Sequence, residues 1–418
     1  MTINHHQLKH IETVIGQMIR FDRPADAVLS AYFREHSKLG ANDRHIIAET
    51  AFGALRRLLQ LRALIAPDKA TPRRLALVAL LKIHKLNVKE LGEAASAGEK
   101  EWLGQIKGKV LPASLEVDAE LPQWVIERLG EQTPEQVIAL GKGLAEGAPL
   151  DLRVNTMKMK RDELLGRLQA DGLECEATPY SPLGIRLKTK PSLAKHELFK
   201  AGVFEVQDEG SQLLGLITGA RRGEMVVDFC AGAGGKTLLL GAQMASSGRL
   251  YAFDVSEKRL AKLKPRQARS GLSNVHPQLL ASENDTKVKR LAGKADRVLV
   301  DAPCSGLGTL RRNPDLKFRQ SPDSVAELNA KQASILASAS RLVRAGGRLV
   351  YATCSLLPQE NQDIVAAFLA DHPDFKLVKM DEVLAEQKIP LQMGDYLELK
   401  PQLHNTDGFF AAVLEKNA

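Results

Sequence analysis

Cysteine is scarce in this sequence, and the patterns of a membrane or exported protein are missing. The 418 residues include four cysteines, and no two of them stand at the CxxC spacing of a zinc ligand pair. We therefore expect a reducing compartment, no disulfide framework and no metal site. No apolar run approaches the ~18 to 20 residues of a membrane span, and the polar start MTINHHQLKH lacks a signal-peptide pattern. These absences predict a cytoplasmic protein that does not bind membranes.

Excess charge of one sign is also modest over the whole chain, but it is concentrated in one region. The net charge is +8, from 58 basic and 50 acidic residues. Between Ser256 and Gln320, fifteen lysines and arginines stand against six acidic residues. Such a region predicts a polyanionic partner such as nucleic acid, although a solvated, lysine-rich helix face has the same composition.

The first half of the chain is expected to form two domains. Residues 1–140 predict a small helical bundle, because apolar residues recur at helical spacing in Asp43 to Ile65 and prolines separate the helical segments. Residues 145–210 predict a small α+β subdomain with a strand at Leu150 to Asn155 and a helix at Arg161 to Asp171.

Residues 211–418 alternate between strand-like and helix-like segments, which predicts a mostly parallel, doubly wound, Rossmann-like α/β sheet. A helix is expected from Ser324 to Val343, with Ser321 as its N-cap and Gly346 and Gly347 as its stop. The seven expected strands are Met225 to Cys230, Arg249 to Val255, Asn274 to Leu280, Ala295 to Pro303, Arg348 to Cys354, Phe375 to Met380 and Phe409 to Leu414.

A glycine-rich stretch, DFCAGAGGKT, follows the first strand of this domain. A phosphate-binding P-loop is disfavoured because Cys230 stands where its first glycine is required, and the dinucleotide pattern GxGxxG fails at Thr237. Asp254 nevertheless follows Gly234 by 20 positions, at the end of the second strand, where an acid can accept the ribose hydroxyls. A glycine loop and a ribose acid without the full dinucleotide pattern fit S-adenosylmethionine better than NAD.

Two further strands end in thiols. Leu299 to Pro314, LVDAPCSGLGTLRRNP, passes from an apolar strand to Cys304, and YATCS ends the next strand at Cys354. Neighbouring strands would bring both sulfurs to the edge where α/β sheets bind ligands. Carbon 5 of a pyrimidine is a poor nucleophile until a thiolate adds to carbon 6, so a methyltransferase with thiols at this edge predicts pyrimidine C5 chemistry. A structural role in a core is the alternative for each cysteine, and it is the one we favour for the side chains of Cys175 and Cys230.

These motifs resemble those of the RNA (cytosine-5) methyltransferases of the Sun, or Fmu/RsmB-like, family. The resemblance extends over roughly 145 to 414 through LRVN near 152, VQDEGSQL from Val206 and DGFFAAVL from Asp407. The helical front, with NDRHIIAE and LPQWVIERL, is similar to the NusB-like, RNA-binding domain of the bacterial rRNA members. One departure is that this chain has Gly232 and Ala233 where the family usually has Ala-Pro, which makes the loop more flexible.

The resemblance implies a role for each matching residue. Cys354 would attack carbon 6, Cys304 would assist breakdown of the adduct, and Asp301 and Lys236 would lie beside the reacting base. DNA C5 methyltransferases instead use the Pro-Cys thiol, here Cys304, and the sequence alone does not order the two. The residues expected to bind the cofactor are Cys230, Ala231, Gly232, Ala233, Gly234, Gly235, Lys236, Asp254, Arg259, Asp285 and Asp301, and those expected to hold RNA phosphates are Arg311 and Arg312.

The implied function is that of an S-adenosylmethionine-dependent RNA cytosine C5 methyltransferase. We expect a monomer that acts on 16S rRNA and forms 5-methylcytosine through a covalent adduct. A tRNA substrate is one alternative, and a non-catalytic RNA-binding ribosome assembly factor is another.

Overall fold

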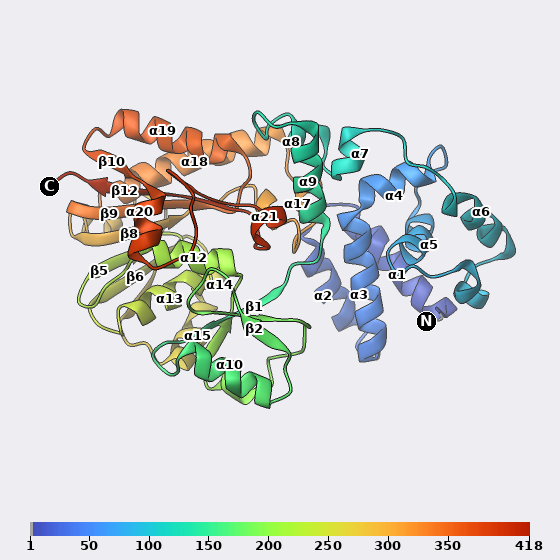
Figure 1. The fold of residues 1–418 in the computed structure, drawn as a ribbon, viewed down its shortest axis with the longest axis horizontal. Helices are drawn as coiled ribbons and strands as arrows, with labels where there is room; N and C mark the ends of the chain where they lie inside the picture. The colour runs from blue at the N-terminus through green and yellow to red at the C-terminus, as the bar shows by residue number, and fades with distance from the viewer. Residues whose placement is uncertain (1–2) are drawn as a thin grey trace. The chain divides into compact units, whose positions relative to one another are not determined.

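In the computed structural model, which describes residues 3–418, the chain divides into two compact units (Figure 1). The first comprises the chain up to Gly147 together with Thr309–Pro322, and the second comprises Ala148–Gly308 and Asp323–Ala418. The segment Thr309–Pro322 follows the Cys304 loop in the sequence but folds with the helical unit. Nothing in the sequence indicated that Thr309–Pro322, which we call the inserted segment, would fold with the helical unit.

The first unit is helical, and side-chain caps define where several of its helices begin. The side chains of Asn4, Ser96 and Thr133 each accept a hydrogen bond from the backbone three residues later, so they satisfy amides that a helix start leaves unpaired. The helices are α1 (His5–Met18), α2 (Ala25–Glu35), α3 (Ala41–Arg56), α4 (Leu58–Ile65), α5 (Pro72–Lys82), η1 (Val88–Ala94), α6 (Ala97–Lys107), α7 (Leu115–Ala119), α8 (Gln123–Ile126), α9 (Pro134–Ala145) and, in the inserted segment, α17 (Leu316–Arg319).

The apolar run from Asp43 to Ile65 is broken into α3 and α4 at Arg57, where φ is −119°. The buried carboxylate of Glu120 accepts hydrogen bonds from the backbone amides of Leu59 and Gln60, at 2.7 and 2.9 Å. These amides belong to the first turn of α4, so Glu120 satisfies donors that the break exposes.

The second unit begins with a small antiparallel sheet in the order β2-β3-β1-β4. Its core is formed by apolar residues of both the strands and α10, including Leu152, Leu164 and Leu168. The expected strand and helix at Leu150 and Arg161 are confirmed. The elements are β1 (Leu150–Val154), α10 (Arg161–Ala170), β2 (Cys175–Ala177), β3 (Gly184–Leu187), α11 (Glu197–Lys200) and β4 (Phe204–Val206).

The large sheet follows, in the order β10-β12-β9-β8-β5-β6-β7, with β11 paired to β12. The seven expected strands are present, the pairings from β9 to β7 are parallel, and β12 is antiparallel to both neighbours. The strands are β5 (Met225–Asp228), β6 (Arg249–Asp254), β7 (Val275–Leu279), β8 (Ala295–Asp301), β9 (Val343–Thr353), β10 (Phe375–Val378), β11 (Leu397–Leu399) and β12 (Phe409–Lys416).

Helices cover both faces of this sheet (Figure 1). Successive residues of β8 alternate between the two cores: Leu299 packs with α12 and α13, whereas Val298 and Val300 pack with α18 and α19. The mostly parallel, doubly wound α/β fold is therefore confirmed. The helices are α12 (Glu209–Thr218), α13 (Gly235–Gln243), α14 (Glu257–Leu260), α15 (Leu263–Ser270), α16 (Thr286–Lys289), η2 (Leu307–Thr309), α18 (Pro322–Ser340), η3 (Pro358–Glu360), α19 (Gln362–Asp371), α20 (Met380–Glu386) and α21 (Pro401–His404).

The bounds of α18 and β9 differ from the sequence-based expectation. Helix α18 ends at Ser340 rather than at Val343, and β9 begins at Val343 rather than at Arg348. Val343 pairs with Ala295 of β8, so the backbone leaves the helix early to join the sheet. Within residues 3–418, no helix is both long and apolar enough to cross a lipid bilayer.

Candidate active site

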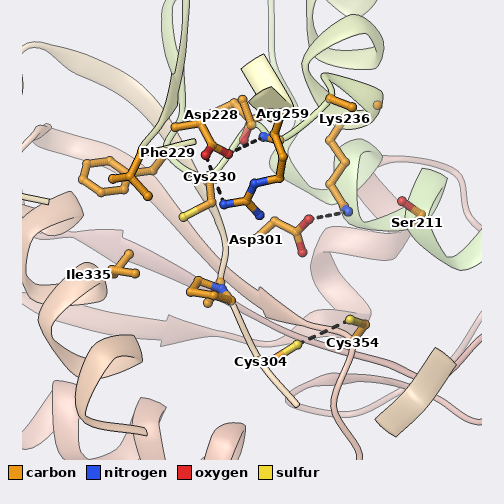
Figure 2. Close-up of a pocket in the computed structure, with 18 of the residues that line it drawn as sticks. Ser211, Asp228, Phe229, Cys230, Lys236, Arg259, Asp301, Cys304, Ile335 and Cys354 are labelled. Atoms are coloured by element: carbon orange, nitrogen blue, oxygen red, sulfur yellow. Dashed lines mark hydrogen bonds and ion pairs between the residues drawn. The ribbon is translucent and has the colours of Figure 1, made fainter. Parts of the chain in front are cut away.

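A cavity of about 600 Å³ lies over the carboxyl ends of the parallel strands (Figure 2). The loops that follow β5, β6, β8 and β9 contribute to its wall, as do helices α13 and α18. Eleven of the residues predicted from the sequence line it: Cys230, Ala231, Gly232, Ala233, Gly235, Lys236, Asp254, Arg259, Asp301, Cys304 and Cys354. The sheet topology has thus brought separate sequence motifs to one place.

Two glycines of the glycine loop have left-handed backbone. Gly232 has a φ of +56°, and its amide donates to Oδ2 of Asp254 at 2.8 Å. Gly234 has a φ of +84°, and a Cβ there would lie 2.1 Å from Cδ1 of Leu263. Left-handed backbone is accessible to glycine without steric cost, so Gly232 allows a loop shape that another residue would strain.

Two arginines outside the expected set fix the far side of this loop. Arg153 of β1 is buried and donates to the carbonyl of Gly235 at 2.6 Å, and burial lowers the pKa of its guanidinium to about 10. Arg266 of α15 donates to the carbonyl of Ala233 at 2.6 Å and pairs with Glu205 at 2.9 Å. Backbone carbonyls of the loop are therefore held from both the small sheet and α15.

Asp254 ends β6 and accepts hydrogen bonds from several groups around the cavity. Besides the amide of Gly232, it accepts from the amide of Ser256 at 2.7 Å and pairs with the guanidinium of Arg259 at 3.1 Å. This position agrees with the sequence-based placement of an acid at the end of the second strand. Arg259 itself is half-exposed, at 56% of its side-chain surface.

Lys236 and Asp301 form an ion pair that faces the thiols across the cavity (Figure 2). Nζ of Lys236 lies 2.7 Å from Oδ2 of Asp301. Burial lowers the pKa of Lys236, but the opposing effects of Asp301, Asp228 and Cys354 outweigh burial and leave that pKa above its usual value. The cavity therefore holds a protonated amine at neutral pH.

Asp228 lies at the end of β5, beneath the glycine loop. Burial is the main reason that its pKa is raised to about 7, and the charge of Asp301 adds to the effect. Oδ2 accepts a hydrogen bond from Thr237 at 2.7 Å, whereas Oδ1 has no hydrogen-bond partner among the described residues. A carboxyl group in this position can change its protonation state near neutral pH.

The two thiols converge as the sequence predicted. Sγ of Cys304 lies 3.4 Å from Sγ of Cys354, and the two strands that precede them, β8 and β9, are parallel neighbours (Figure 2). The pKa of Cys304 is raised well above its usual value, first by the hydrogen bond with Cys354, then by burial and by the charges of Cys354 and Glu360. Cys304 is therefore a protonated thiol that can donate to Cys354.

The structure does not place Asp285 in this cavity. Its carboxylate caps α16, where it accepts from the amides of Ala281 and Lys287 at 2.8 and 2.9 Å. These hydrogen bonds lower the pKa of Asp285. Glu283, two residues earlier, lines the cavity instead. The sequence-based expectation that Asp285 lines the cofactor site is therefore corrected. Its carboxylate caps a helix instead, as acids in short turns often do.

Arg311 is also placed differently from the sequence-based expectation. Its side chain is buried in the helical unit, where its guanidinium donates to the carbonyl of Gly147 at 3.2 Å. Its own carbonyl accepts from Arg56 at 3.2 Å. Such contacts give Arg311 a structural role and argue against a contact with RNA phosphate. Arg312 is partly exposed.

Sequence reasoning did not assign several cavity residues. Gln207 and Ser211, which line the cavity, occur in VQDEGSQL. Arg153, which does not line the cavity but holds the carbonyl of Gly235, occurs in LRVN, so the motifs that carried the family resemblance already contained all three. Lys331 and Ile335 of α18 also line the cavity, but no local motif marks them. Among the described side chains, no cluster of three or more His, Cys, Asp or Glu residues is arranged to hold a metal ion.

Comparisons with known proteins agree with this geometry. A family model described as 16S rRNA methyltransferase RsmB/F matches residues 216–415, and the RsmF/B-like ferredoxin-like domain matches 121–194. The probable ribosomal RNA small subunit methyltransferase B of Synechocystis sp. is 31% identical, over 96% of this chain and 98% of that protein. Ribosomal RNA small subunit methyltransferase B of Pseudomonas syringae pv. tomato is also 31% identical, over 91% of each.

The fold has a solved counterpart as well. The crystal structure of PH0851 matches with a TM-score of 0.80 and 26% identity, over 100% of both chains. Fold, site and near full-length sequence similarity agree, and the chain belongs to the RsmB/F family of S-adenosylmethionine-dependent rRNA methyltransferases, which are RNA cytosine-5 methyltransferases.

Proposed function

We propose that this protein methylates carbon 5 of a cytosine in 16S rRNA, with Cys354 as the nucleophile and S-adenosylmethionine as the methyl donor. The observation that carries the proposal is the pair of sulfurs, 3.4 Å apart, in the cavity that the glycine loop also lines. The rRNA substrate is supported by the description of the matching family and by the names of the relatives. We further propose that it acts as a monomer in the cytoplasm.

The cavity suits S-adenosylmethionine in size and in chemistry. About 600 Å³ lies within the range of cavities that bind cofactors of this kind. The loop from Cys230 to Gly235, with Asp254 and Arg259, would hold the donor, which supplies an electrophilic methyl group. The amide of Gly232 is already bonded to Asp254, so the loop and the ribose acid form one preorganised wall.

Each step of the proposed reaction can be assigned to residues of this cavity. The Cys354 thiolate adds to carbon 6, which makes carbon 5 nucleophilic enough to take the methyl group. In the second step the bond from carbon 5 to its proton and the bond from carbon 6 to the Cys354 sulfur both break, and their electrons restore the ring double bond and leave the sulfur as a thiolate. Cys304, whose sulfur lies 3.4 Å from that of Cys354, would give its proton to the departing sulfur and take up the proton from carbon 5, so that Cys304 is regenerated and Cys354 is released as a thiol. The Lys236–Asp301 pair would stand beside the base.

The two thiols can be distinguished by their adducts with RNA. Incubation of Cys304→Ala with S-adenosylmethionine and 16S rRNA should accumulate a covalent complex that survives denaturing electrophoresis, whereas Cys354→Ala should form none. The reverse pattern would assign the nucleophile to Cys304. Cys175→Ala is the matched control, because Cys175 is a buried cysteine of the small sheet, and it should keep full turnover.

The substrate is tested separately in cells. Bisulfite mapping of RNA from a strain that lacks the gene should show the loss of one 5-methylcytosine in 16S rRNA, restored by the wild-type gene. Loss of a 5-methylcytosine from tRNA instead would show that the substrate is tRNA. An absence of S-adenosylmethionine binding by calorimetry, with RNA binding retained after loss of both thiols, would point to a non-catalytic assembly factor.

A further inference from the structure

Glu360 is a buried acid that the reaction outlined above does not use. It closes the short helix η3 (Pro358–Glu360), six residues after Cys354, and its exposed fraction is 0%. A buried carboxylate is costly unless donors satisfy it, so its surroundings indicate what its presence achieves. Those surroundings are the two loops that carry the thiols.

Each thiol is followed by a buried serine, and both serines bind Glu360. The amide of Ser305 donates to Oε1 at 2.8 Å, and the hydroxyls of Ser305 and Ser355 both donate to Oε2. The two hydroxyl oxygens lie 3.2 Å from each other. One carboxylate therefore joins the residue after Cys304 to the residue after Cys354.

The opposite side of the carboxylate is fixed by α18. Nε2 of Gln332 donates to Oε1 of Glu360 at 3.0 Å and to the carbonyl of Pro303 at 2.9 Å. Both Glu360 and Gln332 have an exposed fraction of 0%. The carbonyl of Glu360 in turn accepts from the hydroxyl of Tyr351 at 2.6 Å. The loops, the helix and β9 thus all meet at this one residue.

We propose that Glu360 is a positioning residue that holds the two thiol loops in register, so that the sulfurs of Cys304 and Cys354 face one another and the base. Glu360 is not among the residues that line the cavity, so it acts through Ser305 and Ser355. This inference rests on the proposed function for its effect on turnover, but its effect on the thiols is independent of that function.

The charge of Glu360 has a second effect on the same loops. It is one of the groups that raise the pKa of Cys304, together with the hydrogen bond and charge of Cys354 and with burial. The other ionisable groups that interact with the sulfurs are Tyr351 on β9, with Cys304, and Lys236 across the cavity, with Cys354. Asp228, Cys230, Asp301 and Lys331 are among the ionisable groups that line the same cavity. Removal of the Glu360 charge alone should therefore lower the pKa of Cys304.

Glu360→Gln tests the proposal because the amide keeps the size of the side chain but loses its charge and one acceptor. We expect kcat for RNA methylation to fall about 10- to 100-fold, since small misplacement of reacting groups is this costly. KM for RNA and the Kd for S-adenosylmethionine should stay within about two-fold, because Glu360 is outside the cavity.

The ionisation of the thiols can be measured directly, in the absence of RNA. Alkylation of Cys304 in the full-length protein, measured by mass spectrometry as a function of pH, should show its ionisation moving to lower pH in Glu360→Gln. Ser355→Ala, which removes one hydroxyl donor, gives a second variant should Glu360→Gln not fold, and it should lower kcat about 10-fold. A purely structural role would lower thermal stability and leave the alkylation curve in place.

Glu209→Gln is the matched control. Glu209 is also fully buried in the same unit, and its carboxylate accepts from the amides of Tyr180 and Ser181 at 2.6 and 2.7 Å. It should lose stability but keep the wild-type alkylation curve and kcat. A folded Glu360→Gln with an unchanged curve and kcat within two-fold of wild type overturns the proposal. A wild-type protein that makes no 5-methylcytosine refutes the proposed function instead, while the alkylation curves still test Glu360.

Discussion

Nζ of Lys236 and Oδ2 of Asp301, 2.7 Å apart, join the first turn of the helix after the glycine loop to the end of β8. The side chain of Lys236 is 11% exposed and that of Asp301 is 29% exposed. Removal of one partner from a buried pair leaves an uncompensated charge, whereas an exposed pair contributes little.

Asp301→Asn should therefore lower the free energy of unfolding by on the order of 2 kcal/mol, less than the ~3–5 kcal/mol of a fully buried pair. Urea titration of the apo protein measures the change. Glu197→Gln is the control, because Glu197 and Lys200 form an exposed pair and its loss should change stability by less than about 0.5 kcal/mol. Equal effects of the two substitutions would contradict this assignment.

Asp228 predicts a specific dependence of stability on pH. Its pKa is about 7 in the folded protein and 3.8 in the unfolded chain, so both states hold the proton below about pH 4. Between about pH 4 and pH 7 the unfolded chain releases the proton first, and the free energy of unfolding falls as pH rises, by up to about 4 kcal/mol. Asp228→Asn stays uncharged and should lose this fall.

Urea titrations of both proteins at pH 5 and pH 8 provide the measurement for Asp228. The difference in free energy of unfolding between Asp228→Asn and wild type should be more favourable to the variant at pH 8 than at pH 5. Other titrating groups are common to both proteins, so their effects cancel in this difference. An equal difference at both pH values would show that Asp228 is already ionised at pH 5.

Gly232 predicts an effect on cofactor binding. Gly232→Ala should strain the loop by about 1 kcal/mol, because φ is +56°, although no atom lies within 4 Å of the added Cβ. We expect the Kd for S-adenosylmethionine to rise about five-fold by calorimetry, as 1.4 kcal/mol corresponds to ten-fold. Gly166→Ala, in the open interior of α10, is the control and should leave the Kd unchanged. Unchanged affinity in Gly232→Ala would mean that the loop adapts without cost.

Lys317 of the inserted segment, Thr309–Pro322, and Glu120 are expected to contribute to stability as a coupled pair within the helical unit. Nζ of Lys317 lies 3.1 Å from Oε1 of Glu120, and the two side chains are 4% and 2% exposed. Lys317→Met should cost about 3–5 kcal/mol, because it leaves a buried charge unpaired. Addition of Glu120→Gln should recover part of this loss, which a double-mutant cycle in thermal unfolding measures. Additive losses would show that the two residues act independently.

The large sheet was predictable because its strands alternate with helices and carry short apolar runs such as Val298 to Val300. The convergence of Cys304 and Cys354 followed from the same pattern, since both follow strands whose carboxyl ends share an edge. Strand β11, at three residues, is too short for its period to be recognised.

Other features depend on contacts between distant parts of the chain. An arginine in a loop has the same local sequence whether it binds phosphate or, like Arg311, a backbone carbonyl. The two serines that bind Glu360 are 55 and 5 residues away from it, and neither is marked by a recognisable spacing. Asp285 was assigned to the cofactor from the family resemblance, whereas in the structure its carboxylate accepts hydrogen bonds from the amides of Ala281 and Lys287.

The position of β12 between β9 and β10 has a consequence for biosynthesis. β12, at residues 409–416, follows all the other strands of this sheet in the sequence, and β10 pairs in the sheet with β12, so β10 has no place there until β12 has been synthesised. Until then the nascent polypeptide exposes the long edge of β9, which leads into the Cys354 loop, and such edges invite aggregation. The large sheet is therefore complete only after residues 409–416 have left the ribosome, and the edge of β9 stays open until then.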